Sequence, residues 1–169
     1  MEKIYQIKRI YTKKTSFYNA AEMPINRHKR WIFKELSEMI KVLFICHGNI
    51  CRSTMSEYVM KYLTDQAGVA SEFYIDSAAT SREEIGNGVH HGTRQKLKEV
   101  GIPCGNHRAR QMMRRDYEEF DYIIGMDAWN IRNIMRIIGS DPEKKVSMLL
   151  DFSDRPRSEE RRVGKECRS

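Results

Sequence analysis

The sequence predicts an α/β domain built on a parallel β-sheet, with helices on both faces of the sheet. Short apolar runs rich in β-forming residues alternate with segments of helical periodicity, and glycines follow the helical segments. This alternation favours right-handed crossovers between parallel strands. The expected strands lie near 41–46, 72–77, 121–126 and 145–150, and the expected helices near 53–67, 91–100 and 127–138, with a short helical turn near 112–118.

The first strand and the helix after it are predicted from the apolar pattern and from capping signals. Residues 41–45, Lys-Val-Leu-Phe-Ile, form a short apolar run that is typical of a buried parallel strand. After Ser53 the apolar residues recur at helical spacing, and Thr54 and Glu57 stand at the spacing of a capping box. We therefore expect a helix that begins near Ser53 and ends before Gly68, where a glycine is favoured.

The later elements repeat this arrangement within one domain. Gly101 follows the second long helical segment and Gly139 follows the third, where helices commonly end. Residues 39–156 are enough for one hydrophobic core, so we predict a single domain over this range. The chain has no apolar run of about 18 residues and no signal-peptide core, so the sequence predicts neither a membrane span nor a membrane partner.

A cysteine and an arginine in the spacing C-x5-R stand between the first strand and the first helix. Cys46 follows the apolar run, and Arg52 and Ser53 open the helical pattern, so the loop between them lies at a helix N-terminus. Backbone N–H groups at such a place favour an oxyanion. The guanidinium of Arg52 matches two phosphate oxygens and stays cationic, and Gly48 lets the backbone come close to a ligand. The loop predicts a phosphate cradle with a nucleophile at its base.

The chemistry of a phosphocysteine requires the residue types that this loop holds. A thiol attacks phosphorus well only as a thiolate, which a helix N-terminus and a nearby guanidinium stabilise. The hydroxyl of Ser53 can donate to the sulfur of Cys46 and make it a better leaving group when the intermediate is hydrolysed. The alternative is a structural cysteine beside a helix cap, which is what a bare C-x5-R usually represents. The strand before the loop and the helix after it favour the phosphate site.

Several segments of the chain resemble the low-molecular-weight protein tyrosine phosphatases. Besides the loop from Cys46 to Ser53, residues 75–80, Ile-Asp-Ser-Ala-Ala-Thr, are similar to the end of the second strand in that family. Residues 101–111 resemble the segment that carries a histidine bracing the phosphate loop, and residues 120–130 resemble the third strand and the helix after it. The resemblance covers residues 39–156.

The resemblance implies a flavodoxin-like three-layer sandwich whose four strands follow the order 2-1-3-4, with the loop at the switch point after the first strand. It also implies that Cys46 is the nucleophile, Arg52 the phosphate-binding arginine and Ser53 the hydroxyl that stabilises the thiolate. Hydrogen bonds among three residues would brace the loop, and five loop residues would surround the phosphate. The bracing residues are Asn49, Ser77 and His107, and the loop residues are His47, Gly48, Asn49, Ile50 and Cys51.

Cysteine usage favours a reducing compartment, so we predict a cytoplasmic protein. Of the four cysteines, Cys167 lies near the C-terminus, and Cys46, Cys51 and Cys104 do not form a convincing disulfide framework. A reversible disulfide between Cys46 and Cys51, which the resemblance also implies, could protect the thiolate from over-oxidation. The sequence shows no metal-ligand spacing, and phosphocysteine chemistry requires neither a metal nor another cofactor.

The basic charge of the chain belongs to its two ends. The net charge is +7, yet residues 1–38 hold nine Lys and Arg against four Asp and Glu, and residues 157–169 hold five against three. Residues 39–156 are therefore neutral, which leaves a nucleic-acid partner of this region without electrostatic support. A nucleic-acid-binding extension over residues 1–38 stays an alternative.

Both ends are interpreted as foreign to the domain. Residues 157–167 resemble the translation of a sequencing adapter, so we interpret residues 157–169 as an adapter-derived tail rather than a solvated basic tail. Met39 stands two residues before the first strand, and we expect translation to begin there. Residues 1–38 would then be a non-native or disordered basic extension, and residues 39–156 the phosphatase domain.

The sequence lacks the general acid that the resemblance leads us to expect. The family carries an aspartate in an Asp-Pro-aromatic loop after the fourth strand, followed by a last helix. Here the only Asp-Pro is Asp141-Pro142, before that strand, and Asp151 and Asp154 stand upstream of the expected place of the acid. We therefore expect a domain truncated at its C-terminus, without its last helix, with low stability and impaired activity, because losing a general acid costs about 10²–10⁴ in rate.

Four functions remain open at this stage. The first is hydrolysis of phosphotyrosine in a protein, or of a small aryl phosphate. The second is that of a protein arginine phosphatase or an arsenate reductase of the same fold. A non-catalytic phosphate-binding module and a nucleic-acid-binding protein complete the set. Ile50 favours phosphotyrosine, since the arginine phosphatases carry threonine there, whereas Arg82, Glu83 and Glu84 stand where the family often has a tyrosine-selecting aromatic residue.

Overall fold

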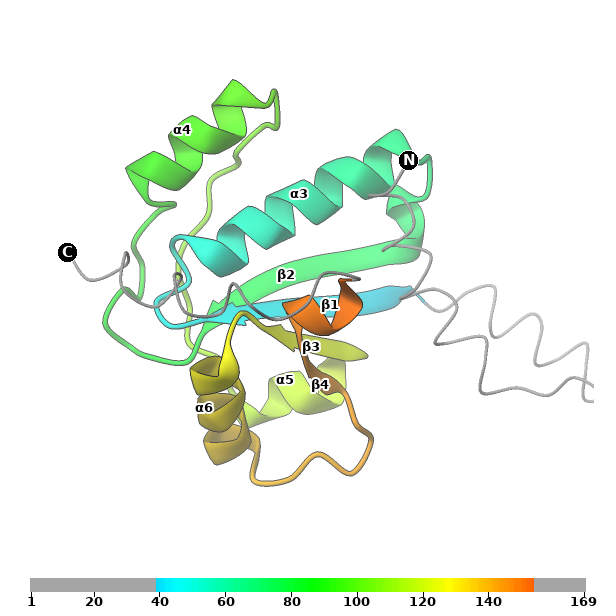
Figure 1. Cartoon of the computed structure of the whole chain (residues 1–169), viewed down its shortest axis with the longest axis vertical. Helices are drawn as coiled ribbons and strands as arrows, with labels where there is room; N and C mark the ends of the chain where they lie inside the picture. The colour runs from blue at the N-terminus through cyan, green and yellow to red at the C-terminus, as the bar shows by residue number, and fades with distance from the viewer. Residues whose placement is uncertain (1–38, 154–169) are drawn as a thin grey trace, which may run out of the picture.

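Four parallel strands form one sheet in the computed structural model, which describes residues 39–153 (Figure 1). The order of the strands across the sheet is β2-β1-β3-β4. This order confirms the flavodoxin-like arrangement that the family resemblance implied. The strands span Ile40–Cys46 (β1), Phe73–Ala79 (β2), Tyr122–Gly125 (β3) and Val146–Met148 (β4).

Strand β1 lies in the middle of the sheet, and both of its faces are covered. It pairs with β2 along its whole length and with β3 from Val42 to Ile45. Val42 and Phe44 belong to one apolar cluster, whereas Leu43 and Ile45 belong to a second one. Burial on both faces explains why this strand is apolar at nearly every position rather than at every second one.

Helices cover both faces of the sheet (Figure 1). Helix α3 (Arg52–Gln66) lies on one face, and α5 (Arg114–Glu119) and α6 (Ala128–Ile138) lie on the other. Helix α4 (His91–Glu99) packs against α3. The three predicted layers are therefore present, with α4 added on the outer side of α3. The cluster between α3 and α4 contains Tyr58, Val89, Leu97 and Ile102.

The long helices begin and end close to where the sequence predicts, but the N-cap of α3 differs from the predicted one. Gly68, Gly101 and Gly139 follow the three helices with positive φ values of 71°, 71° and 86°, which glycine adopts without strain. The predicted capping box is wrong, because α3 begins at Arg52 with Cys51 as its N-cap. At this register the hydroxyl of Thr54 donates back to the carbonyl of Cys51 at 2.8 Å.

The fourth strand is shorter than the predicted range of 145–150. Strand β4 ends at Met148, and a 3₁₀ turn, η3 (Leu149–Phe152), follows it. The turn is favoured because the carboxylate of Asp151 accepts the N–H of Met148 at 2.9 Å, and because Phe152 is buried in the same apolar cluster as Val42. A second 3₁₀ turn, η2 (Ala70–Glu72), leads into β2.

The predictions about the two ends of the chain fall outside the described residues. They concern residues 1–38, Asp154, the adapter-derived tail over 157–169 and the missing last helix. Within residues 39–153, no helix is both long enough and apolar enough to cross a bilayer.

Candidate active site

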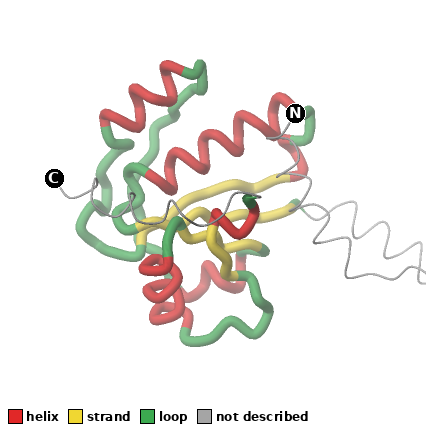
Figure 2. Tube along the Cα trace, in the orientation of Figure 1, coloured by secondary structure: helices red, strands yellow, loops and turns green. Residues whose placement is uncertain are grey.

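The loop between β1 and α3 lies at the carboxyl edge of the sheet. Cys46, the last residue of β1, is in register with Ala79 of β2, and Ile45 is in register with Gly125 of β3. Strand β1 thus has a later strand on each side, and Figure 2 shows its end passing through a short loop into α3. This is the switch point of the sheet, where open α/β folds bind their ligands.

The sulfur of Cys46 is buried and hydrogen-bonded inside this loop. The residue is 3% exposed, and its Sγ lies 3.1 Å from Oγ of Ser53. The backbone N–H of Asn49 donates to the same sulfur over 3.2 Å. Ser53 is fully buried, so its hydroxyl is held beside the sulfur. A backbone N–H and a hydroxyl on one sulfur form the kind of surroundings that accommodate a thiolate.

The guanidinium of Arg52 has one nitrogen in an ion pair and one buried N–H without an acceptor. Its Nη1 donates to Oδ2 of Asp127, the N-cap residue of α6, at 2.5 Å. Its Nε is buried and finds no acceptor among residues 39–153. Because an unsatisfied buried donor is costly, Nε is suited to donate to an oxyanion in the loop.

Asn49 connects the loop to its surroundings. Its backbone φ is 57°, in the left-handed region that asparagine adopts more readily than most residues. Its Nδ2 donates to Oγ of Ser53 at 3.0 Å and to Oγ of Ser77 on β2 at 2.7 Å. Nε2 of His107 lies 2.7 Å from its backbone oxygen. The structure therefore brings Asn49, Ser77 and His107 together around the loop.

Arg110 binds the other end of the Asn49 side chain, and the sequence did not single it out. Its backbone N–H donates to Oδ1 of Asn49 at 3.1 Å. Since Asn49 is fully buried, both ends of its amide need partners, and both have them. The guanidinium of Arg110 donates to Asp76 on β2 at 2.8 Å and to Asp116 on α5 at 3.0 Å.

Glu57 is a second residue of the site that the sequence reasoning missed. Oγ of Ser77 donates to its Oε2 at 2.5 Å, and Nδ1 of His107 lies 4.0 Å from the same oxygen. Glu57 is 4% exposed, and its other oxygen pairs with Lys61. Its carboxylate directs the Ser77 hydroxyl, which therefore accepts from Asn49. The available signal was the four-residue spacing from Ser53, which places both side chains on one face of α3.

The segment after β2 borders the first half of the loop. Nε2 of His47 lies 3.1 Å from Oε2 of Glu83. A Cβ placed on Gly48 would lie 2.9 Å from Cγ of Glu84. Glycine at this position therefore makes room for Glu84, a reason beyond the ligand approach that the sequence predicts.

The second half of the loop is joined to the same segment and to α3. The N–H of His90 donates to the carbonyl of Ile50 at 2.9 Å, and Cys51 is the half-buried N-cap of α3. Cys46 and Cys51 are not joined by a disulfide, and their redox pairing stays a prediction. In the part of the chain that the structure describes, no group of three or more His, Cys, Asp and Glu residues could hold a metal ion.

One family of known proteins matches most of the chain. The family is described as low molecular weight phosphotyrosine protein phosphatase, and the match spans residues 41–165. It begins two residues after Met39 and runs past residue 156. The domain boundaries at these two residues stay predictions.

Individual relatives agree with the family match. The low molecular weight protein-tyrosine-phosphatase YfkJ of Bacillus subtilis is 40% identical over 114 residues, which cover 68% of this chain and 73% of that protein. The crystal structure of YfkJ from Bacillus subtilis is similar with a TM-score of 0.69 at 38% identity, covering 72% of this chain and 76% of that one. The crystal structure of a Drosophila arginine phosphatase is similar with a TM-score of 0.58 at 31% identity, covering 64% and 69%.

Proposed function

This chain belongs to the low molecular weight phosphotyrosine protein phosphatase family and is a protein tyrosine phosphatase, and we propose that it forms a covalent phosphocysteine on Cys46. One observation carries this proposal. A buried, hydrogen-bonded sulfur and the buried Nε of Arg52, which lacks an acceptor among residues 39–153, belong to the same loop at a helix N-terminus. Such a loop offers a nucleophile and donors to the same phosphate group.

In the first step the loop binds the phosphate dianion of phosphotyrosine. Nε of Arg52 and the backbone N–H groups of the loop donate to its non-bridging oxygens. The thiolate of Cys46 attacks phosphorus, an S–P bond forms, and the bond from phosphorus to the phenolic oxygen breaks. The phenolate leaves with the electron pair of that bond and takes a proton.

In the second step water attacks phosphorus and the S–P bond breaks. Inorganic phosphate is released, and the sulfur of Cys46 leaves as a thiolate. The hydroxyl of Ser53, 3.1 Å from that sulfur, stabilises the negative charge by donating a hydrogen bond. Asn49, Ser77 and His107 act as positioning residues, because their hydrogen bonds hold the loop and Ser53 in place.

We propose that residues 39–153 do not supply a general acid for the leaving phenolate. The carboxylate of Asp127 is engaged with Arg52, and that of Asp151 accepts the N–H of Met148. Glu57 accepts from Ser77 within the bracing network. Asp154 lies outside the described residues. The chain is therefore expected to act faster on substrates whose leaving group needs no proton.

A protein arginine phosphatase is the second candidate function. The likeness to the Drosophila arginine phosphatase favours it, and so do the carboxylates of Glu83 and Glu84 beside the loop, which suit a guanidinium. Ile50 favours phosphotyrosine instead. Comparing kcat/KM for a phosphotyrosine peptide and a phosphoarginine peptide decides between the two functions.

Hydrolysis of p-nitrophenyl phosphate by the Cys46→Ser variant tests the proposed nucleophile. The rate is expected to fall by at least about 10⁴-fold, because a serine hydroxyl in this place has no adjacent base to activate it. Cys104→Ser is the matched control, since Cys104 packs against the apolar cluster between α3 and α4 and is not part of the phosphate loop. Retained activity in Cys46→Ser would exclude a phosphocysteine. Inorganic phosphate that still binds Cys46→Ser without turnover supports a phosphate cradle.

The redox role of Cys51 has its own test. Peroxide would convert the Cys46 thiolate to a sulfenic acid, and the thiol of Cys51 would displace water to form a disulfide. Dithiothreitol is then expected to restore activity to the oxidised wild type and to restore less of it to Cys51→Ser. Equal recovery in both proteins would refute the pairing. We also propose a cytoplasmic protein, because a thiolate enzyme of this kind requires a reducing compartment. We propose no nucleic-acid or membrane partner, since residues 39–156 carry no net charge.

A further inference from the structure

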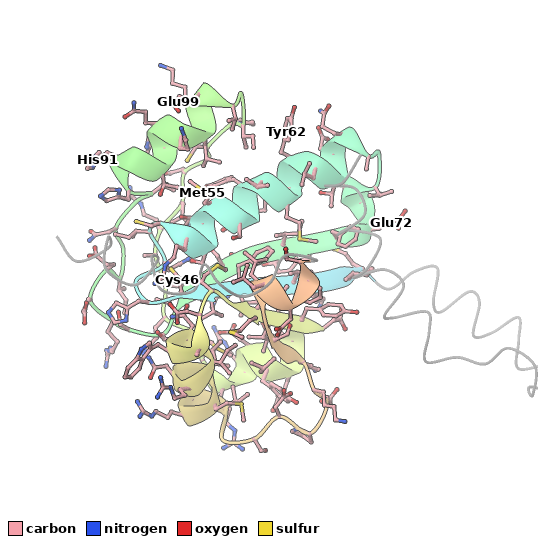
Figure 3. The ribbon with its side chains drawn as sticks, in the orientation of Figure 1. Cys46, Met55, Tyr62, Glu72, His91 and Glu99 are labelled. Atoms are coloured by element: carbon pink, nitrogen blue, oxygen red, sulfur yellow. The ribbon has the colours of Figure 1, made fainter. Side chains whose placement is uncertain are left out.

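Trp129 is an exposed aromatic residue on the first turn of α6. It is 64% exposed and stands two residues after Asp127, whose carboxylate is paired with Arg52 of the phosphate loop. Figure 3 shows α6 starting beside the end of β1 at Cys46. Helical side chains lean toward the N-terminus of their helix, so the indole of Trp129 leans toward the end of α6 that meets the phosphate loop at Arg52.

Arg132 lies one turn further along α6 and stacks on this indole. Its Cζ is 4.0 Å from the centre of the Trp129 ring. Arg132 is exposed, and it forms no ion pair with any residue from 39 to 153. By contrast, Arg52 and Arg110 both pair with aspartates. Stacking restricts the guanidinium while leaving its N–H groups able to bind a carboxylate.

We propose that Trp129 and Arg132 form a second recognition surface, which binds an acidic residue next to the phosphotyrosine of a protein substrate. This inference rests on the phosphatase function and specifies the substrates of the same site. The carboxylate of the acidic residue would pair with Arg132, and the apolar part of the bound segment would cover the indole. Tryptophan and arginine are among the residue types that most often provide binding energy at protein interfaces.

The charges on the other border of the phosphate loop predict that this surface distinguishes the two sides of the phosphotyrosine. Glu83 and Glu84 lie against His47 and Gly48, whereas α6 meets the loop at Arg52. A segment whose phosphate lies at the loop would meet a cation on the α6 side and carboxylates on the side of Glu83. An acidic residue is therefore expected to favour binding on one side of the phosphotyrosine only.

Three phosphotyrosine peptides of equal length test the inference on the full chain. One has Glu directly before the phosphotyrosine, one has Glu directly after it, and one has Gln at both places. We measure kcat/KM for each peptide relative to that for p-nitrophenyl phosphate. The relative kcat/KM of one Glu peptide is expected to exceed that of the Gln peptide about two- to fivefold, which is the effect of an exposed ion pair. Arg132→Gln should remove this preference, and Trp129→Ala should lower the relative kcat/KM of all three peptides about fivefold.

Arg136→Gln is the matched control for Arg132→Gln. Arg136 is exposed on the same helix, one turn further from the phosphate loop, and donates to Asn133 at 3.1 Å. The Arg136→Gln variant should retain the wild-type preference for one of the two Glu peptides. Loss of that preference in Arg136→Gln would assign the effect to the overall charge of α6 and would refute a specific role of Arg132.

Binding to the Cys46→Ser variant gives a readout that does not require turnover. Trp31, the other tryptophan of the chain, is replaced by Phe, so that fluorescence reports on Trp129 alone. Tighter binding of one Glu peptide with a change in Trp129 fluorescence supports the inference. Equal binding of all three peptides, or no change in fluorescence, overturns it. Failure to hydrolyse p-nitrophenyl phosphate would count against the catalytic function and would leave this binding result to stand by itself.

Discussion

The backbone N–H of Arg110 donates to Oδ1 of Asn49 over 3.1 Å, from a residue whose guanidinium bridges two aspartates. Asp76 lies on β2, directly before Ser77, and Asp116 lies on α5. Arg110 therefore ties a strand and a helix together at the point where the segment after α4 meets the phosphate loop. Its two aspartates fix the position from which its N–H reaches Asn49.

Replacement of Arg110 by Met should destabilise the protein and weaken the phosphate site. Asp116 is 2% exposed and would keep a buried charge without its cation, so we expect the free energy of unfolding to fall by about 3 kcal/mol. Denaturant unfolding measures this change. Arg108→Met is the control, because Arg108 is exposed and donates only to the carbonyl of Gly86 at 3.4 Å. Equal stability of the two variants would show that the aspartate pairs contribute nothing.

Replacement of Glu57 by Gln should disturb the hydrogen bonds that hold Ser77 and Asn49. The carboxylate now accepts the hydroxyl of Ser77 at 2.5 Å in a buried place, and an amide can present a donor there instead. We expect a loss of about 1–3 kcal/mol in the free energy of unfolding and a lower kcat for p-nitrophenyl phosphate at temperatures where the variant is folded. Glu99→Gln, which changes an exposed pair with Lys96, should leave both quantities unchanged.

The fold and the phosphate loop could be predicted because their signals are local. Residues 41–45 are apolar at almost every position since β1 is buried on both faces, and this short run is followed at once by the C-x5-R loop and a helical pattern. Gly68 and Gly139 mark helix ends by their own backbone conformation. The end of β4 was missed because the carboxylate of Asp151 favours a 3₁₀ turn over a longer strand.

Glu57, Arg110 and Asp127 support the loop from outside and could not be predicted in the same way, whereas Ser77 and His107 were expected from the family resemblance. Glu57 acts on Ser77, 20 residues away, and Arg110 acts on Asn49, 61 residues away. Asp127 reaches Arg52 across 75 residues. Each of these contacts depends on which strands and helices lie side by side. A local pattern carries no such information, and the pattern around Glu57 indicated a capping box instead.

Replacement of Asp127 by Asn should weaken the binding of oxyanions. The amide oxygen of Asn can still accept the N–H of Asn130, now 2.7 Å from Oδ1 of Asp127, so the start of α6 should persist. The ion pair that orients Arg52 would be lost, and we expect the inhibition constant of inorganic phosphate to rise about three- to tenfold. Unchanged inhibition would show that the loop holds Arg52 without Asp127. Circular dichroism controls for the integrity of α6.

The alkaline stability of the protein should depend on Tyr58. Burial raises the pKa of Tyr58 to about 12, and the charges of Glu57 and Cys104 act in the same direction. In the unfolded chain the same phenol ionises near pH 10, so its contribution to stability is complete below pH 10 and is lost as the pH rises to about 12. Tyr58→Phe should therefore lose less stability than the wild type between pH 10 and 12. Parallel pH profiles for the two proteins would contradict this, and measurements at pH 8 provide the reference.

The dependence of the rate on the leaving group tests the absence of a general acid among the described residues. The carboxylates around the loop all have partners: Asp127 binds Arg52, Glu57 binds Ser77, Glu83 lies against His47, and Glu84 accepts from Asn87. We infer that none of them protonates the departing phenolate, so the rate should follow the basicity of that phenolate. We expect the rate constant for phosphorylation of Cys46, measured in a single turnover, to be at least about 100-fold higher for p-nitrophenyl phosphate than for phenyl phosphate. Similar rates for the two substrates would reveal a proton donor, and repeating the comparison with Asp154→Asn would show whether that residue is the donor.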